Sequence, residues 1–322
     1  MMAQALIFPG QGSQAVGMGR ALFDASAAAR EVFAEVDAAL GEPLSRTVFE
    51  GPEDDLRLTA NAQPALMACS IAALRCLEER AGRPAAALAT VVAGHSLGEY
   101  SALVAAGALE LSAAARLLRL RGEAMQAAVP VGEGAMAAII GLEPEVVAEV
   151  ASLAGEAGVC DVANDNAPGQ VVVSGARAAV ERAVALAKER GARRSVLLPV
   201  SAPFHCRLMA PAAERVAAAL EHLELARPAL PVITNVTAEP EEEPRRLKEL
   251  LVLQITARVR WRESILAMAA RGVERTVELG AGQVLTGLTR RIVKEMEAVS
   301  LGTPDEIDAA LAGGAAGEGA AA

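Results

Sequence analysis

One serine stands in a setting that favours nucleophilic chemistry. Ser96 is the central residue of Gly94-His95-Ser96-Leu97-Gly98, which fits the pattern Gly-x-Ser-x-Gly. The apolar run over residues 85–92 precedes the pattern and an Ala/Leu-rich segment follows it, so it falls between a predicted strand and a predicted helix. A serine on such a sharp turn exposes its hydroxyl, and the free N–H groups of the next helix favour negative charge there. A chance match is the alternative, and the flanking elements argue against it.

A serine nucleophile needs a base to accept its proton, and the chain contains three histidines. His95 is adjacent to Ser96, and neighbours on a tight turn cannot orient their side chains toward each other usefully. His222 lies in an acidic segment at a predicted helix end, which indicates a surface histidine. His205 lies in a proline-flanked loop, where catalytic groups are often mounted, and it follows the serine as in α/β-hydrolases. We therefore predict His205 as the base, with a partly buried loop histidine as the alternative.

No acidic side chain is evident as a third member of the site. Asp161 and Asp165 lie in a segment that the pattern assigns to a separate small domain. A backbone carbonyl holds the same imidazole tautomer without a charge. A main-chain oxygen is therefore the candidate that orients the histidine.

Alternating strands and helices must bring these residues together. Apolar segments over residues 3–8, 232–236 and 276–279 predict further strands, and helical patterns separate them. This alternation predicts an α/β fold with a mostly parallel sheet. The helical patterns cover about residues 19–40, 64–81 with Pro64 in the first turn, 97–106, 112–128, 208–223, 247–253, 261–270 and 284–297.

The order of the predicted strands and helices changes between residues 130 and 200. Six short elements there follow the order βαββαβ, the split βαβ pattern of a ferredoxin-like domain. We therefore predict an α/β-hydrolase-like large domain formed by residues 1–129 and 201–312, with an inserted ferredoxin-like small domain over residues 130–200. Residues 313–322 are a low-complexity Gly/Ala tail, for which we predict disorder.

Composition and charge exclude several classes of function. The 322 residues carry a formal net charge of −10, which argues against nucleic acid as a partner. No apolar run reaches the length of a membrane span, and no basic region precedes the apolar residues of the N-terminus, so neither a membrane partner nor a secretory signal is expected. The four scattered cysteines lack metal-ligand spacing, which indicates free thiols in a cytoplasmic protein.

Six segments carry a resemblance to a known family. They are Phe8-Pro9-Gly10-Gln11-Gly12-Ser13-Gln14, Gly94-His95-Ser96-Leu97-Gly98-Glu99-Tyr100, Arg121-Gly122-Glu123-Ala124-Met125, Asn166-Ala167-Pro168-Gly169-Gln170, Pro203-Phe204-His205 and Glu278-Leu279-Gly280-Ala281-Gly282-Gln283-Val284-Leu285. Together they resemble the malonyl-CoA:acyl-carrier-protein transacylases of bacterial fatty-acid synthesis. The likeness runs in order from about residue 4 to residue 295, which makes it far more specific than the serine pattern alone.

The resemblance implies a role for each matched residue of the reacting centre. Ser96 would take the malonyl group as an ester, and His205 would act as general base and then as general acid. Gln11 and the backbone N–H of Leu97 would form the oxyanion hole. Arg121 would bind the free malonyl carboxylate in a bidentate ion pair, to which a planar guanidinium is suited.

The resemblance also implies roles for residues around that centre. The backbone carbonyl of Gln254 would orient the histidine, and Asn166 would face the site. Phe204 resembles the malonyl-selecting residue of related acyltransferases, where a large ring crowds a 2-methyl branch. Arg193 and Arg194 match a basic pair and would help to dock the acidic carrier protein. The segment after Gln254 departs from the family, which often has Tyr-Asn-Pro before a Val-x-Trp.

The implied chemistry is ping-pong acyl transfer. Malonyl-CoA and acyl carrier protein are the expected partners, and CoA and phosphopantetheine enter only as parts of the substrates. No metal or redox cofactor is expected, and we expect the chain to act as a monomer.

Three alternatives share parts of this pattern. A serine hydrolase or thioesterase would have the same turn but would need neither the guanidinium of Arg121 nor a carrier protein. A non-catalytic carrier-binding subunit would not need an intact Ser96 and His205. A discrete acyltransferase of a polyketide pathway would carry out identical chemistry, and the sequence hardly separates it from the enzyme of fatty-acid synthesis.

Overall fold

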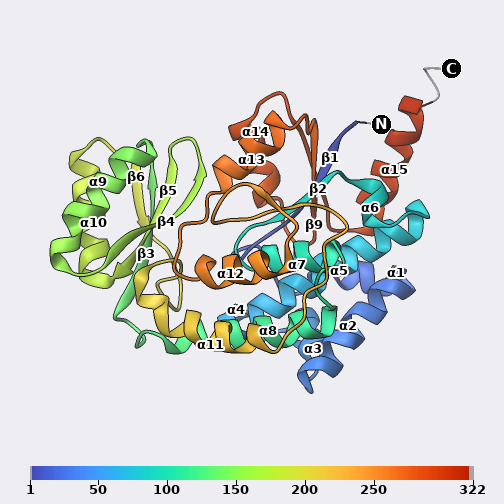
Figure 1. Cartoon of the computed structure of the whole chain (residues 1–322), viewed down its shortest axis with the longest axis horizontal. Helices are drawn as coiled ribbons and strands as arrows, with labels where there is room; N and C mark the ends of the chain where they lie inside the picture. The colour runs from blue at the N-terminus through green and yellow to red at the C-terminus, as the bar shows by residue number, and fades with distance from the viewer. Residues whose placement is uncertain (1, 319–322) are drawn as a thin grey trace.

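The structure, a computed structural model, describes residues 2–318 (Figure 1). It is a mixed α/β fold whose strands, within these residues, form two separate sheets. The smaller sheet and its two helices lie at one end of the long axis of the molecule, and the larger sheet lies among the remaining helices (Figure 1).

The larger sheet is mostly parallel. Its strand order is β10-β9-β1-β2-β7-β8, and every neighbouring pair is parallel except the antiparallel pair β7 and β8. Strands β1 and β2 lie in the middle, and their register pairs Phe8 with Gly94. The strands are β1 (Gln4–Phe8), β2 (Val91–Gly94), β7 (Val232–Ile233), β8 (Pro240–Glu241), β9 (Arg275–Leu279) and β10 (Glu297–Leu301).

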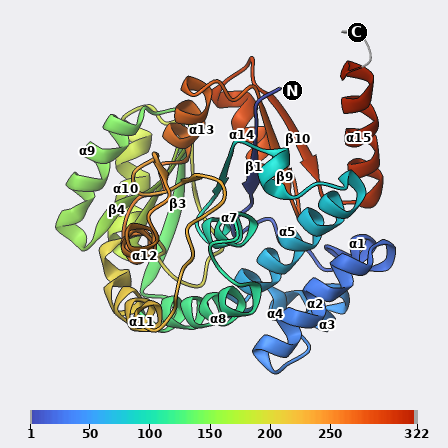
Figure 2. The same cartoon turned by 45° about the vertical axis from the view of Figure 1, so that its right-hand side comes forward.

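Helices cover both faces of this sheet, which explains why its central strands read as continuous apolar runs. Leu6 and Phe8 of β1 pack into a core with α5 and α8, whereas Ala5 and Ile7 pack on the opposite face with α13 and α14 (Figure 2). The helices of this part are α1 (Arg20–Ala25), α2 (Ala27–Leu40), α3 (Leu44–Glu50), α4 (Glu53–Arg57), α5 (Thr59–Ala81), α6 (Ala85–Leu88), α7 (Gly98–Ala105), α8 (Leu111–Ala127), α11 (Ala210–Glu221), α12 (Pro244–Gln254), α13 (Trp261–Ala270), α14 (Val284–Ile292) and α15 (Pro304–Glu318).

The smaller sheet is antiparallel and has its own core. Its order is β4-β5-β3-β6, with antiparallel pairing throughout. One face packs on α9 and α10, and the other contributes Met136, Ala163 and Val172 to the core of the larger unit. The elements are β3 (Gly134–Ile140), α9 (Pro144–Ala154), β4 (Cys160–Ala167), β5 (Gln170–Ala176), α10 (Arg177–Glu189) and β6 (Arg194–Leu197).

Charged contacts hold the smaller unit against the larger one. Arg262 of α13 donates to both carboxylate oxygens of the buried Asp165, at 2.8–3.1 Å. Arg207 donates to Asp161 at 2.9–3.1 Å. The backbone N–H of Asp165 donates to the carbonyl of Val259 at 2.9 Å, so the chain segment before α13 extends one edge of the small sheet.

Three local expectations were wrong. Helix α5 begins at Thr59, so Pro64 lies inside the helix rather than in its first turn. The run before β2 begins with the short helix α6, because its alanines favour a helix. The pattern over residues 284–297 ends as a helix at Ile292, and the missed strand β10 pairs with β9. Disorder of the tail stays a prediction: α15 extends to Glu318, and residues 319–322 lie outside the described part.

Among the described residues, no helix is both long enough and apolar enough to cross a membrane.

Candidate active site

Ser96 lies on a tight turn between β2 and α7. Its φ is 53°, a left-handed conformation that is strained for a residue with a side chain. The glycines on either side are required by space. A Cβ on Gly94 would lie 1.9 Å from the carbonyl of Gly98, and a Cβ on Gly98 would lie 2.2 Å from the carbonyl oxygen of Phe8. The turn is therefore pressed against the end of β1, and the serine side chain is directed away from it.

The structure brings Ser96 and His205 into hydrogen-bond contact. The distance from Ser96 Oγ to His205 Nε2 is 2.8 Å, and His205 Nδ1 lies 2.8 Å from the backbone carbonyl oxygen of Gln254. A carbonyl only accepts, so Nδ1 carries the proton and Nε2 accepts from the serine hydroxyl. The departure from the family sequence after Gln254 therefore leaves this contact intact.

The environment of His205 keeps its imidazole neutral. The residue is buried, and desolvation together with the positive charge of Arg121 lowers its pKa to about 3, although the contact with the Gln254 carbonyl acts in the opposite direction. A neutral imidazole is the form that accepts a proton from a hydroxyl.

Arg121 projects from α8 into the same site and is only 1% exposed. Its guanidinium donates to Gln63 Oε1 at 2.7 Å, to Gln254 Oε1 at 2.9 Å and to Ser96 Oγ at 3.1 Å. These three partners are neutral, and the carboxyl group of Glu99 acts on the guanidinium across the side-chain amide of Gln254. A buried guanidinium beside the serine hydroxyl, without a carboxylate partner, is arranged to receive an anion.

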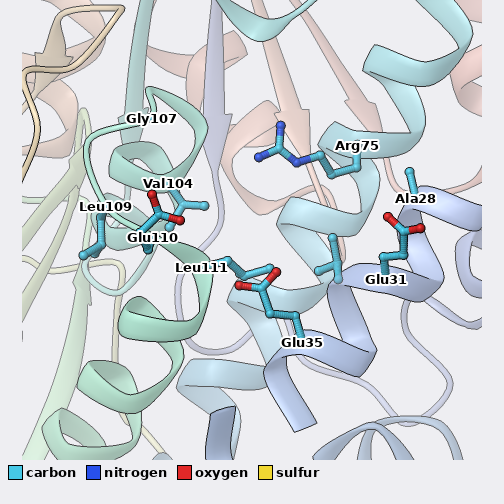
Figure 3. Close-up of a pocket in the computed structure, with 10 residues that line it drawn as sticks. Ala28, Glu31, Glu35, Arg75, Val104, Gly107, Leu109, Glu110 and Leu111 are labelled. Atoms are coloured by element: carbon cyan, nitrogen blue, oxygen red, sulfur yellow. The ribbon is translucent and has the colours of Figure 1, made fainter. Parts of the chain in front are cut away.

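One cavity of about 500 Å³ lies between the two units, and its wall includes Ser96, Arg121 and His205. Sequence-predicted residues at its wall include Gln11, Leu97, Asn166 and Phe204. The cavity in Figure 3 is a different one: it measures about 250 Å³, lies between α2, α5 and the start of α8, and includes none of the predicted residues. The larger cavity is therefore the candidate active site.

The other two histidines lie as the sequence indicates. His95 directs Nε2 to Asn166 Oδ1 at 2.9 Å, and its ring is 5.6 Å from that of Trp261. Burial lowers the pKa of His95, so it is a neutral residue that connects the serine turn to the small sheet. His222 is exposed at the end of α11.

Gln11 follows β1 in an exposed loop at the cavity wall. Its amide donates to Thr59 Oγ1 at 3.2 Å, and Thr59 in turn lies 3.0 Å from Ser201 Oγ. The backbone of Leu97 immediately precedes α7, so its N–H belongs to the turn that carries the serine. Arg193 and Arg194 are exposed at the start of the edge strand β6 and do not line the cavity.

The sequence reasoning missed three residues of the site: Gln63, Glu99 and Asn235. Gln63 accepts from Arg121, and Asn235 accepts the backbone N–H of Ser96 at 2.6 Å. Glu99 belongs to the segment Gly94–Tyr100, and Asn235 follows the short strand β7. In both places the only signal in the sequence is a polar residue in an apolar context. Within residues 2–318, no group of three or more His, Cys, Asp or Glu side chains is placed so that it could hold a metal ion.

The fold and this site define an α/β protein with a serine–histidine pair on a strand-to-helix turn. The chain belongs to the acyl transferase family, because the family model described as "Acyl transferase domain" matches residues 5–314.

Named relatives are similar over almost their whole length. The malonyl CoA-acyl carrier protein transacylase of Bacillus subtilis (strain 168) is 45% identical over 308 residues, which cover 95% of this chain and 96% of the relative. The crystal structure of an acyl-carrier-protein-S-malonyltransferase from Bartonella henselae is 55% identical with a TM-score of 0.94, covering 96% and 98% of the two chains. A type II PKS acyl-carrier protein in complex with its malonyl-transacylase provides another similar chain, at 42% identity and a TM-score of 0.93, covering 97% and 99%.

Proposed function

We propose that the protein transfers the malonyl group of malonyl-CoA to the phosphopantetheine thiol of acyl carrier protein, which supplies the extender unit for fatty-acid synthesis. The observation that carries this proposal is the buried Arg121 guanidinium 3.1 Å from Ser96 Oγ. A hydrolase of neutral acyl groups would gain nothing from a cation there. The names of the relatives support the same substrates.

The first half of the reaction forms an ester on Ser96. His205 Nε2 accepts the hydroxyl proton while Oγ attacks the thioester carbonyl, and the developing oxyanion accepts hydrogen bonds from the Leu97 N–H and the Gln11 amide. The carbon–sulfur bond breaks, and the CoA thiol leaves with the proton from the imidazolium. The ester is the covalent intermediate.

The second half runs in the opposite direction. The carrier-protein thiol gives its proton to His205 Nε2 and its sulfur attacks the ester carbonyl. The ester carbon–oxygen bond breaks, and Ser96 Oγ regains the proton. Throughout both halves the Gln254 carbonyl holds the imidazole in the reactive tautomer, at 2.8 Å from Nδ1.

Two contacts select the acyl group. Arg121 pairs with the malonyl carboxylate, and the Phe204 ring at the cavity wall crowds a 2-methyl branch. Asn166 also lines the cavity, and its contact with His95 holds it there. The reaction needs no metal or redox cofactor, because proton transfer and covalent catalysis account for each step.

We assign the larger unit, residues 1–129 and 201–312, to an α/β-hydrolase-like core and residues 130–200 to a ferredoxin-like insertion. The order βαββαβ and the antiparallel strand order β4-β5-β3-β6 support the second assignment. The enzyme acts as a monomer, since one chain supplies every group of the site. Four unpaired, buried cysteines support a cytoplasmic location.

The carrier protein docks beside β6 in this proposal, with Arg193 and Arg194 as its basic contact. Charge reversal of both residues raises KM for carrier protein and leaves KM for malonyl-CoA unchanged. Reversal of the exposed Arg245 and Arg246 on α12 is the matched control. Equal effects of the two double variants, or equal effects on both substrates, would argue against this docking site.

The decisive test of the function is incubation with malonyl-CoA alone, followed by intact-mass and peptide analysis. A malonyl adduct on Ser96, absent from Ser96→Ala and passed on to holo carrier protein, is the expected result. Free malonate as the main product would instead identify a thioesterase. The absence of any adduct would identify a carrier-binding subunit without activity. Parallel assays with carrier proteins of the fatty-acid and polyketide types distinguish the two pathways.

A further inference from the structure

We propose that Glu99 is a positioning residue whose buried carboxyl group fixes Gln254 and Asn235. Through these two residues it holds the serine turn, the carbonyl that orients the imidazole and the guanidinium of Arg121 in their relative positions. The proposal rests on the acyl-transfer function proposed above. Glu99 is an acidic group of the site that the sequence did not reveal, and it does not contact the histidine.

Glu99 lies in the first turn of α7 and is completely buried. Its Oε2 accepts two hydrogen bonds, from the backbone N–H of Asn235 at 2.8 Å and from the side-chain amide of Gln254 at 3.0 Å. Its Oε1 has no hydrogen-bond partner in the described part of the chain. Burial raises the pKa of Glu99 to about 7, so the two contacts hold a carboxyl group that the fold has desolvated.

One branch of the contacts leads to the nucleophile through Asn235. The side-chain Oδ1 of Asn235 accepts a hydrogen bond from the backbone N–H of Ser96 at 2.6 Å, and its Nδ2 donates to the backbone carbonyl of Gly94 at 2.6 Å. The asparagine side chain therefore bridges the turn that holds Ser96 in its left-handed conformation. Glu99 fixes the backbone from which this side chain extends.

The other branch leads to the base and the guanidinium through Gln254. Its Nε2 donates to Glu99 and also to the backbone carbonyl of Ser96, at 3.0 Å each, and its Oε1 accepts from Arg121 at 2.9 Å. Because a carboxylate accepts and a guanidinium donates, these two neighbours determine which way the amide faces. The backbone carbonyl of the same residue accepts from His205 Nδ1, so Glu99 restrains the side chain of the residue that orients the imidazole.

The amide of Gln254 also separates the two charges. Glu99 acts on Arg121 across one intervening amide group, since each lies about 3 Å from it. A carboxylate in direct contact with the guanidinium would compete with the malonyl carboxylate for it. The indirect arrangement restrains Arg121 and leaves it available to the substrate.

Another buried carboxyl group provides a matched control. Glu278 is also completely buried and also accepts two hydrogen bonds, from the backbone N–H groups of Leu285 and Thr286 at 3.1 and 2.7 Å. Its pKa is likewise raised by burial. It caps α14 and touches none of the site residues, so its loss affects stability without affecting the geometry of the site.

The test distinguishes the effect of the length of the Glu99 side chain from the effect of its charge. Glu99→Gln keeps the length and an acceptor oxygen but loses the charge, whereas Glu99→Asp keeps the charge but is one methylene group too short for both contacts. The rate of Ser96 malonylation is measured in single turnovers by intact mass, per folded molecule, over a range of malonyl-CoA concentrations. We expect Glu99→Asp to lower the maximal rate by about 10- to 100-fold with little change in the half-saturating concentration, and Glu99→Gln to remain within about fivefold.

Glu278→Gln and Glu278→Asp should lower Tm and leave the rate per folded molecule unchanged. The proposal is overturned if Glu99→Asp reacts as fast as the unchanged protein, if Glu99→Gln is the slower of the two Glu99 variants, or if the Glu278 variants lose the same rate. A fluorophosphonate that labels Ser96 without an acyl-CoA is the second readout, with the same order expected. If the unchanged protein reacts with the fluorophosphonate but not with malonyl-CoA, the proposed function fails, while the order of labelling rates still decides the role of Glu99.

Discussion

Replacement of Arg121 by methionine should remove the preference for a charged acyl group. The methionine side chain retains much of the aliphatic volume but no positive charge. The malonyl carboxylate would then be buried without a partner, which costs about 3–5 kcal/mol. At about 1.4 kcal/mol for each factor of ten, kcat/KM for malonyl-CoA should fall roughly 100- to 4,000-fold.

Acetyl-CoA gives the internal reference for this magnitude. Gln63 and Gln254 lose a donor in the variant whichever substrate is bound, so that loss affects both substrates and cancels in their ratio. The acetyl group has no carboxylate, and its kcat/KM should change only within a few-fold after correction for folded protein. The malonyl-to-acetyl ratio should therefore fall by about two to three orders of magnitude.

The assay is direct competition between the two acyl-CoA thioesters. Malonyl and acetyl adducts on Ser96 are counted by mass at short times, in a mixture without carrier protein. Arg116→Met on the exposed face of the same helix is the control and should leave the ratio unchanged. An Arg121→Met variant with an unaltered ratio, or with equal losses for both substrates, would refute the assignment of the guanidinium to the malonyl carboxylate.

Three further outcomes follow from the structure. The pKa of His205 is near 6.5 in the unfolded chain and about 3 in the folded protein, so the free energy of unfolding decreases as the pH falls through this window. Relative to His205→Gln, this free energy should decrease by about 2 kcal/mol between pH 7 and pH 5, as measured by urea unfolding. Gly94→Ala should cost about 3 kcal/mol or more, because its Cβ would overlap the next turn of backbone, whereas Gly155→Ala, with open space, should stay within about 0.5 kcal/mol by the same measurement. Phe204→Ala should raise kcat/KM for methylmalonyl-CoA relative to malonyl-CoA by about tenfold, measured by competition.

Each of these has an outcome that contradicts it. If the free energy of unfolding depends on pH in the same way in the protein and in His205→Gln, the pKa of the imidazole is not lowered by folding. A Gly94→Ala variant as stable as Gly155→Ala would mean that the turn has room to relax. An unchanged preference in Phe204→Ala would place the barrier to the methyl branch elsewhere in the cavity.

The contact between Ser96 and His205 was predictable because its signals are local. The Gly-x-Ser-x-Gly spacing identifies a turn that only small flanking residues permit, and only one of three histidines lies in a suitable loop. The orienting group is different in kind. Gln254 acts on His205 through its backbone carbonyl, which every residue type possesses, so its side chain gave no clue and only the family resemblance pointed to it.

The supporting residues could not be predicted, because their roles arise from long-range contacts. Asn235 and Glu99 are 136 positions apart, yet the N–H of the first donates to the carboxyl group of the second. Strand β10 was missed for the same reason: its residues directly follow a predicted helix, and its parallel pairing with β9 is a contact that no local pattern reveals. Elements with strong local patterns, such as the strand β1 and the helices α8 and α13, were predicted within a few residues.

The order of the site residues along the chain has a consequence for protein synthesis. Ser96 leaves the ribosome before His205, and Gln254, whose carbonyl orients the imidazole, follows last. A nascent or truncated polypeptide thus presents the alcohol without its proton acceptor and consumes no thioester in the cell. Competence for acyl transfer arises only when the final third of the polypeptide has folded onto the rest.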